Sequence, residues 1–365
     1  MSDGGDRPRV AVIPGDDAAP EAMAATMSVL ESMHVAVDFH HVPAGAALAR
    51  LGRAERDAVV REAIDGCDTA LFGASSGSTS AILYLRWGRD TYANVRPIRW
   101  RPGVPTPLRA PEGIDYVIVR ENLEDVYAGI EGDLDVLRDA GLDLRGYAGL
   151  LGITPTWMTG AGRFGVKVVT RENTERVARF AGQLARRRQA DGHPGRITCG
   201  TKRNIAPRTD GFFADTVRDV VTGQFPDLEY EAYLADDLGR RLVADPAAFD
   251  VVVLPNLFGD LLSDVGAATV GGLGTVPSGC YGDGYAYFEP VHGTAPDIAG
   301  RHAINPVATL LSAALMLAHL GLTEEGARLE GAVDAALASG KALTPDLGGR
   351  ATTEELTDAV REHLE

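Results

Sequence analysis

The sequence lacks the features that mark membrane, secreted and nucleic-acid-binding proteins. No apolar run approaches the roughly 18 residues of a membrane span, and the opening stretch MSDGGDRPRVAVIPGDD has no apolar signal-peptide core. Basic residues are also in deficit, since 35 of them face 51 acidic residues and leave a net charge of −16. A nucleic-acid-binding surface needs the opposite balance. We therefore expect a cytoplasmic protein with no membrane or nucleic-acid partner.

Cysteine is scarce and its placement excludes two further kinds of site. Cys67, Cys199 and Cys280 are odd in number, far apart and without zinc-type spacing. Neither a disulfide framework nor a zinc centre is predicted. Reduced, buried thiols are the expected state of all three.

The chain length and the order of its segments predict the fold class. A chain of 365 residues exceeds the size of one ordinary core, so two domains or two lobes are expected. Short apolar segments rich in β-branched residues alternate with helical stretches such as 172–188 and 209–223, and the chain is mostly helical from Asn305 onward. This alternation predicts an α/β fold with a largely parallel sheet. The expected strand segments are 9–14, 35–42, 68–74, 115–122, 196–202, 228–237 and 249–256.

Residues 131–164 interrupt this alternation and are predicted to be an insertion. Within and just after it, GAGRFG at 160–165 satisfies the pattern G-x-G-x-x-G. A dinucleotide-binding fingerprint must follow a strand and open a helix, whereas the next residues, VKVVTRE, favour a strand. We interpret these glycines as turn residues and predict no classical Rossmann motif.

Two aspartates four residues apart, Asp260 and Asp264 in PNLFGDLLSD, suggest a metal site. On a helix they share one face and repel each other unless a cation lies between them. Hard divalent ions such as Mg²⁺ or Mn²⁺ prefer such carboxylate oxygens. Asp236, which follows a strand-like segment in ADD, could supply a third ligand. The alternative for the pair alone is a solvated helix face.

Basic and phenolic residues suggest a site for an acidic substrate. Guanidinium groups bind carboxylates through two hydrogen bonds, so Arg86, Arg96 and Arg120 would hold a di- or tricarboxylate if they converge. Lys202 could act as a base and Tyr127 as the matching acid. Taken singly, each arginine fits a surface or ion-pair role better than a substrate-binding one.

Together these segments resemble the β-decarboxylating dehydrogenases, which include isocitrate, isopropylmalate, homoisocitrate and tartrate dehydrogenases. The resemblance covers roughly residues 9–130 and 165–325. It rests on LRWGRDTYANVRP, VRENLEDVYAGIEG, KVVTRENTERVARFA, PNLFGDLLSDVGAATVGGLG and FEPVHGTAPDIAGRHAINP, which occur in the family's order. It implies a two-lobed fold in which residues 1–97 and 272–365 form one lobe and residues 98–271 the other, with the dimer interface and a clasp at 131–164.

The resemblance also implies the reaction and the roles of the site residues. The reaction is oxidative decarboxylation of a 3-substituted malate by a homodimer with shared active sites. The implied substrate-binding residues are Ser80, Ile82, Leu83, Arg86, Arg96 and Arg120, the implied catalytic residues Tyr127, Lys202 and Asp236, and the implied metal ligands Asp236, Asp260 and Asp264. Lys202, Asn204 and Asp236 are expected to come from the neighbouring subunit.

A loop at 292–300, HGTAPDIAG, resembles the adenosine-binding loop of the family. Asp297 would accept hydrogen bonds from ribose hydroxyls and repel a 2′-phosphate, so NAD is the expected cofactor. NADP users of the family carry Lys-Tyr where this chain has Asp297 and Ile298. The implied cofactor-binding residues are Asn204, His292, Gly293, Thr294, Ala295, Asp297, Ile298 and Asn305.

The substrate within this class stays open, because two signals conflict. Ile82 and Leu83 form an apolar pair that favours an alkyl substituent, since burying an unpaired carboxylate there is costly. The insertion at 131–164, in contrast, lies where isocitrate dehydrogenases carry a clasp. A tartrate- or malate-type enzyme and a catalytically weak regulatory subunit are the alternatives. Two departures from the family pattern, GDDAAPEA near the N-terminus and Asp237 after Asp236, have effects that the sequence leaves undetermined.

Overall fold

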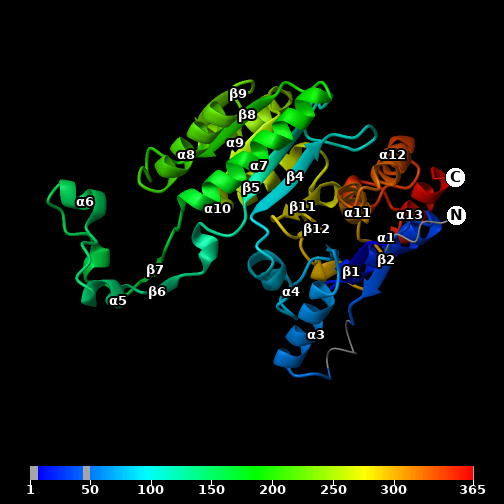
Figure 1. Ribbon diagram of the computed structural model, residues 1–365, viewed down its shortest axis with the longest axis horizontal. Helices are drawn as coiled ribbons and strands as arrows, with labels where there is room; N and C mark the ends of the chain where they lie inside the picture. Colours follow the sequence, from blue (N-terminus) through cyan, green and yellow to red (C-terminus); the bar gives the residue numbers. More distant parts are fainter. Residues whose placement is uncertain (1–6, 44–49, 365) are drawn as a thin grey trace.

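A computed structural model describes residues 7–43 and 50–364 of the chain. One ten-stranded sheet runs through it in the order β2-β1-β3-β12-β11-β4-β5-β10-β8-β9 (Figure 1). The strands are β1 (Arg9–Ile13), β2 (Asp38–His41), β3 (Thr69–Phe72), β4 (Ala93–Arg99), β5 (Asp115–Glu121), β8 (Arg196–Thr201), β9 (Glu229–Leu234), β10 (Val251–Leu254), β11 (Pro277–Tyr281) and β12 (Ala286–Pro290).

Most neighbouring strands are parallel, which confirms the predicted α/β class. The exceptions lie in the middle of the sheet, where β4 pairs antiparallel with both β5 and β11, and β11 pairs antiparallel with β12. Ten helices accompany the sheet in the described part of the chain. They are α1 (Ala19–Ser32), α3 (Arg53–Asp65), α4 (Ala81–Leu83), α7 (Arg171–Ala190), α8 (Asp210–Gln224), α9 (Ala235–Ala244), α10 (Asn256–Thr269), α11 (Val307–His319), α12 (Thr323–Ser339) and α13 (Thr353–Glu362).

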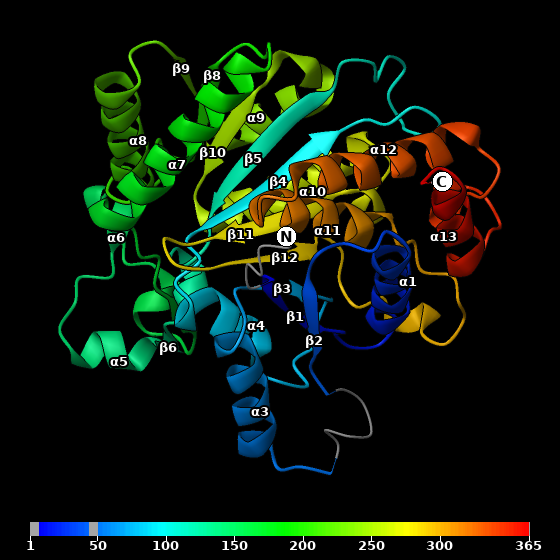
Figure 2. The ribbon, with the colours of Figure 1, turned by 45° about the vertical axis from the view of Figure 1, so that its right-hand side comes forward.

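Helices cover both faces of the sheet, and alternate residues of each strand enter opposite cores. Val251 and Val253 of β10 pack in the core that contains α7 and α8. Val252 and Leu254 pack on the other face, in the core that contains α9 and α10. A strand buried on both sides is apolar at every position, which is why VVVL was recognisable as a strand. The layers are visible in Figure 2.

Two local expectations were wrong. Residues 166–172 were predicted as a strand, but only Val168 forms a bridge, to Asp125, before α7 begins at Arg171. The segment 228–237 was predicted to be β-rich to its end, but β9 stops at Leu234 and α9 begins at Ala235. The acidic pair 236–237 therefore lies in the first turn of a helix, where the helix dipole favours negative charge.

The insertion forms an arm that projects from the body of the protein (Figure 1). Its root is a two-stranded antiparallel ribbon of β6 (Glu131–Asp133) and β7 (Arg163–Gly165). Between these strands lie α5 (Leu134–Asp139), α6 (Gly146–Leu150) and a short 3₁₀ turn (Thr156–Met158). Gly165, the last glycine of GAGRFG, ends β7 and opens no helix. The pattern is therefore not a Rossmann loop.

The two-lobe division stays a prediction, although the strand order groups the sequence in the same way. Strands β1, β2, β3, β11 and β12 come from residues 1–97 and 272–365 and lie on one side of β4. Strands β5, β8, β9 and β10 come from residues 98–271 and lie on the other side.

Candidate active site

Arg120 lies at the end of β5 and is fixed by helix α10. Its side chain is 1% exposed, and its Nε and Nη2 donate to Asn256 Oδ1 at 2.9 and 2.7 Å. Its Nη1 contacts Asp260 Oδ1. Gly259 makes this approach of helix and strand feasible, because a Cβ there would lie 2.5 Å from Arg120 Cγ. The motif PNLFGD thus supplies an amide, a glycine and a carboxylate to one buried guanidinium group.

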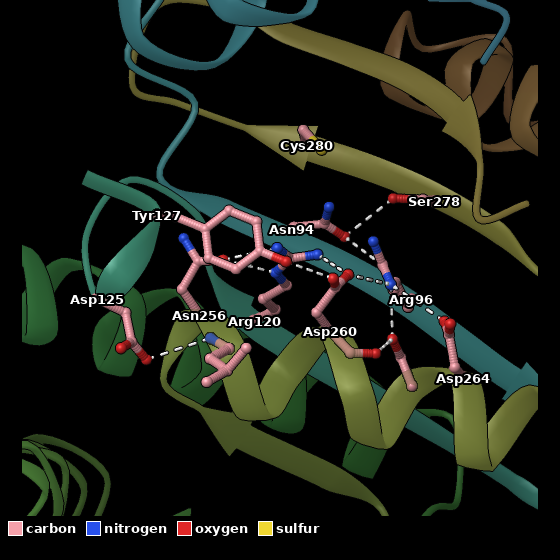
Figure 3. A network of polar contacts seen from close by, with 12 residues as sticks. Asn94, Arg96, Arg120, Asp125, Tyr127, Asn256, Asp260, Asp264, Ser278 and Cys280 are labelled. Atoms are coloured by element: carbon pink, nitrogen blue, oxygen red, sulfur yellow. Dashed lines mark hydrogen bonds and ion pairs between the residues drawn. The ribbon is translucent and has the colours of Figure 1, made fainter. Parts of the chain in front are cut away.

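Arg96, on β4, reaches the same helix from the neighbouring strand (Figure 3). Its Nη1 donates to Ser263 Oγ at 2.6 Å and lies 3.2 Å from Asp260 Oδ1 and 3.8 Å from Asp264 Oδ1. Its Nε donates to Asn94 Oδ1 at 3.2 Å. Three residues that orient these arginines, Asn94, Asn256 and Ser263, were not predicted from the sequence. All three lie within quoted motifs, which was the signal available, and all three are buried.

The two aspartates of α10 have different surroundings. Burial tends to raise the pKa of Asp260, but Arg120 and Arg96 hold that pKa below its usual value. Burial raises the pKa of Asp264, and Arg96 opposes this increase incompletely. The expected mutual repulsion is therefore reduced by guanidinium groups at Asp260. The Nη1 atom of Arg96 lies 3.8 Å from Asp264 Oδ1, so the Asp264 carboxylate remains available as a metal ligand.

Tyr127 completes this group. Its hydroxyl donates to Asp260 Oδ2 at 2.5 Å, and its ring lies 4.7 Å from the guanidinium carbon of Arg120 and 5.9 Å from that of Arg86. Burial and the hydrogen bond to Asp260 raise the pKa of Tyr127 above its usual value. The phenol is therefore protonated at neutral pH and can donate a proton.

Glu289 on β12 is a further charged neighbour that the sequence analysis did not identify. Burial raises its pKa, while Arg86, Arg96 and Arg120 act in the opposite direction. Its Oε1 accepts weak hydrogen bonds from Tyr287 Oη at 3.4 Å and from Cys280 Sγ at 3.8 Å. The three arginines therefore form one electrostatic cluster, and Glu289 lies at its edge.

Lys202 and Asp236 form a separate group. Lys202 Nζ donates to Asp236 Oδ1 at 2.6 Å, and this hydrogen bond lowers the pKa of Asp236. Asn204 lies two residues beyond Lys202 and is exposed. Across residues 7–43 and 50–364, no ion pair or hydrogen bond connects Lys202 or Asp236 to Tyr127, Asp260 or Asp264. Asp237 instead pairs with Arg240 and Arg241 on its own helix, at 2.7 and 2.6 Å.

The residues at α10 fit a divalent cation. Asp260 and Asp264 are hard oxygen ligands on successive turns of one helix, beside guanidinium groups that would hold a chelating acid. Mg²⁺ commonly takes one or two carboxylates and completes its coordination with water and substrate. Within the described ranges, no group of three His, Cys, Asp or Glu residues could hold a metal. One protomer therefore supplies two carboxylates, and any further ligand comes from substrate, water or another protomer.

The loop that resembles an adenosine site packs against the N-terminal turn. Ala18 N donates to Thr294 O at 3.0 Å, and Ile298 and Ala295 pack on Ala18. Asp17 has φ 54°, a conformation that glycine adopts more easily, so the turn forms despite the replacement of glycine in GDDAAPEA. Asp297 is exposed beside this loop and His292 Nδ1 contacts Gly293 O at 2.8 Å.

Asn305 lies just beyond the same loop and is buried. Its Nδ2 donates to Asp346 Oδ2 at 2.9 Å, and its Oδ1 accepts from Val307 N at 3.0 Å at the start of α11. This side chain therefore anchors the end of the loop. The loop residues 292–298 and Asn305 are brought together, whereas Asn204 lies on the separate segment after β8.

The three specificity candidates Ser80, Ile82 and Leu83 lie in different environments. Ser80 is 8% exposed and its backbone N donates to Asp57 Oδ1 at 2.8 Å. Ile82 packs against a core cluster, whereas the Leu83 side chain is 52% exposed. Leu83 is therefore the apolar member of the pair that is free to touch a ligand.

Comparisons with known proteins identify the family of the chain. The sequence profile described as "Isocitrate/isopropylmalate dehydrogenase" matches residues 9–360. A "3-isopropylmalate/3-methylmalate dehydrogenase" of Methanocaldococcus jannaschii is 42% identical, with 98% of each chain covered. An "Isocitrate/homoisocitrate dehydrogenase" of Thermus thermophilus is 40% identical, again with 98% of each chain covered. The solved structure of an isocitrate dehydrogenase from Methylococcus capsulatus has a TM-score of 0.82 and 32% identity, and the match covers 98% of this chain and 99% of that one.

No helix in the described part of the chain combines the length and the apolar character that crossing a membrane requires. The compartment stays a prediction.

The profile match, the full-length relatives and the shared fold agree with the motifs from which the resemblance was first drawn. The chain therefore belongs to the isocitrate/isopropylmalate dehydrogenase family and is a decarboxylating dehydrogenase.

Proposed function

We propose that this enzyme oxidatively decarboxylates a 3-substituted malate with NAD⁺ and Mg²⁺ or Mn²⁺, and that its substituent is alkyl, as in 3-isopropylmalate. The observation that carries the proposal is the pair of arginines, Arg96 and Arg120, held beside Asp260 and Asp264 on α10. Guanidinium groups bind the malate carboxylates, and the aspartates bind the cation. The groups that would bind an acidic substrate therefore lie beside the groups that would bind a metal ion.

Each residue has a defined part in the reaction. Arg86, Arg96 and Arg120 bind and orient the carboxylates, and Lys202, or a water or aspartate that it polarises, takes the proton of the C2 hydroxyl. Tyr127, which its raised pKa keeps protonated, delivers a proton to the carbon that loses CO₂. Asp260 and Asp264 would hold a divalent cation, which would supply electron withdrawal from the hydroxyl and carboxylate of the substrate. NAD⁺ would accept the hydride, and Asp297 would favour it over NADP⁺ by repelling a 2′-phosphate.

The alkyl preference is supported by Leu83 and by one relative. Leu83 offers an exposed apolar surface near Arg86, and no basic side chain occupies positions 78–85 to pair with an additional carboxylate. The relative from Methanocaldococcus jannaschii is named for 3-isopropylmalate and 3-methylmalate. Isocitrate is the second candidate, because the Thermus thermophilus relative is named for isocitrate and homoisocitrate.

Steady-state turnover of both substrates with Mg²⁺ and NAD⁺ tests this proposal. We expect a higher kcat/KM for 3-isopropylmalate than for isocitrate, and we expect Leu83→Arg to reverse the order by pairing with the third carboxylate of isocitrate. Leu261→Arg, at an exposed leucine on α10, controls for a general effect of added charge. Preference of the wild type for isocitrate would reject the alkyl assignment, and no turnover of any 3-substituted malate would reject the function.

A homodimer with shared active sites is part of the same proposal. Lys202 and Asp236 are paired with each other but lie apart from Tyr127 and Asp260, so a complete site is proposed to combine two protomers. The arm also exposes large apolar side chains, including Leu150 at 81% and Leu151 at 76%, that an adjoining protomer would cover.

Mixing two inactive variants tests the sharing of sites. Tyr127→Phe and Lys202→Met homodimers should each have little activity. After dissociation and remixing, about a quarter of wild-type activity should return, because half of the dimers are hybrids with one intact site. Remixing each variant with itself is the control. No recovery from dimers shown to be hybrid by mass spectrometry would reject shared sites.

A further inference from the structure

Lysine is rare in this chain, and its placement is informative. Only three of the 35 basic residues are lysines, namely Lys167, Lys202 and Lys341. Lys341 lies in an exposed turn. Lys167 follows β7, where the arm returns to the body, and no role was assigned to it above.

Lys167 lies between two buried carboxylates. Its Nζ is 3.4 Å from Asp125 Oδ2 and contacts Asp210 Oδ1 more closely. Both aspartates are 1% exposed, whereas Lys167 is 21% exposed and its Nζ also lies 5.0 Å from the centre of the Phe258 ring. Two buried carboxylates therefore share one ammonium group, and removing one partner of such a buried arrangement is strongly destabilising.

Each of these aspartates holds a different part of the site. Asp125 lies two residues before Tyr127, and its carboxylate accepts from Val126 N at 2.8 Å and from Leu257 N, in the first turn of α10, at 3.2 Å (Figure 3). Asp210 accepts from the backbone N of Lys202 at 2.9 Å. Lys167 thus joins the Tyr127 loop and the metal helix to the segment that carries Lys202.

The backbone at Asp125 shows that its side chain has a role. Asp125 has φ 65° and ψ −148°, a combination that glycine adopts readily and other residues rarely do. Glycine there would relieve the strain but would remove the contacts to Lys167, Val126 and Leu257. The strained conformation is therefore maintained by the contacts of the carboxylate.

We propose that Lys167 is a positioning residue that, through Asp125 and Asp210, fixes both the Tyr127 loop of one active site and the Lys202 segment that the same protomer gives to the other site. This rests on the roles of Tyr127 and Lys202 in the proposed function. The substrate arginines are oriented by Asn94, Asn256 and Ser263, none of which contacts Lys167 in the described part of the chain. Loss of Lys167 therefore lowers kcat more than it raises KM.

Three variants and one control test the proposal. Lys167→Met should lower kcat by about 10²-fold while KM for the malate changes less than about threefold, because a small misplacement of proton-transfer groups is costly. Lys167→Arg, which keeps the charge, should recover much of the loss. Lys341→Met should match the wild type. Asp125→Gly leaves Lys167 and Asp210 as a balanced pair and relieves the backbone, so it should fold and still lose kcat.

Amide hydrogen exchange of the ligand-free dimer provides a readout that does not depend on turnover. Lys167→Met should speed exchange at both the 122–128 segment and the 200–206 segment, whereas Asp125→Gly should affect only the first. If the wild type turns over no malate, the proposed function is rejected. The amide hydrogen exchange rates of the variants would still test the positioning role of Lys167. The inference would be overturned if Lys167→Met left amide exchange unchanged in both segments. It would also be overturned if Lys167→Met and Asp125→Gly each kept a kcat within about threefold of wild type.

Discussion

Replacing either aspartate of α10 by asparagine should affect the metal-free protein in different ways. Asp260→Asn preserves size but removes the charge that faces Arg120 and Arg96, whose side chains are 1% and 8% exposed. Breaking a buried ion pair costs about 3–5 kcal/mol, whereas an exposed pair contributes about 0–1 kcal/mol. The Asp260 side chain is 34% exposed, so we expect a loss of about 2 kcal/mol in the free energy of unfolding.

Asp264→Asn should have little effect or a stabilising one. Its side chain is 55% exposed and 3.8 Å from Arg96, and burial raises its pKa, which means that the folded state disfavours its charge. The free energy of unfolding should stay within about 0.5 kcal/mol of wild type or rise. Two identical substitutions one helical turn apart are thus expected to differ.

The pH dependence of the two variants follows from opposite pKa shifts. The pKa of Asp260 is lowered on folding, so its stabilisation is fully present above the unfolded pKa and is lost as pH falls through the folded pKa. The pKa of Asp264 is raised, so its destabilisation is present above the folded pKa and is relieved as pH falls through it. The deficit of Asp260→Asn should therefore shrink in acid.

Thermal unfolding followed by circular dichroism, with EDTA at neutral pH, measures these differences. Asp237→Asn is the matched control, because the Asp237 side chain is similarly exposed, at 36%, and also pairs with two arginines, but those arginines are 62% and 39% exposed, so the variant should melt with the wild type. Adding Mg²⁺ and a malate should stabilise the wild type and neither α10 variant. Equal melting of Asp260→Asn and Asp264→Asn, or wild-type melting of Asp260→Asn, would refute the electrostatic reasoning.

Three further outcomes are expected. Tyr127→Phe should lower kcat by about 10²- to 10⁴-fold with little change in KM in steady-state kinetics, and an unchanged kcat would exclude Tyr127 as the proton donor. Asp297→Ser should reduce the preference for NAD⁺ over NADP⁺ by about tenfold, measured as the ratio of kcat/KM values, because the repulsion of the 2′-phosphate is removed. Glu121 is 3% exposed and burial raises its pKa from 4.5 to about 7, so its ionisation costs stability that builds up between these two pH values and stays constant above about pH 7. Glu121→Gln should therefore flatten the pH dependence of melting between about pH 4.5 and pH 7, and an unchanged slope there would contradict the assignment.

The sequence predicted the fold where burial determines composition. Strands β1, β5 and β10 are covered on both faces, so their segments contain continuous apolar runs. The strands that were missed, β4, β11 and β12, lie in the middle of the sheet and carry polar or breaker residues. ANVRPIR holds Arg96 and a proline, and AYFEP holds Glu289. A strand that presents charge to a site loses the pattern by which strands are recognised.

The sequence predicted which residues belong to the candidate site but not how they are arranged in space. Motif spacing identified Asp260 and Asp264 as a pair, but the arginines that neutralise Asp260 come from β4 and β5, which lie far from α10 in sequence. Their distances depend on antiparallel pairing in the middle of the sheet, which no local pattern encodes. The same holds for Lys167, whose two partners are 42 and 43 residues away on either side.

In the proposed function, the charges at α10 would make the binding of the metal and the binding of the substrate mutually favourable. Asp260 pairs with Arg120 and Arg96, so a cation would compete with these guanidinium groups for the carboxylate. A malate carboxylate would compete with Asp260 for the same guanidinium groups. Each ligand would release the partner that the other needs, and thermodynamic linkage requires both affinities to rise by the same factor. The arrangement that neutralises Asp260 would therefore also favour joint binding of the cation and the acid.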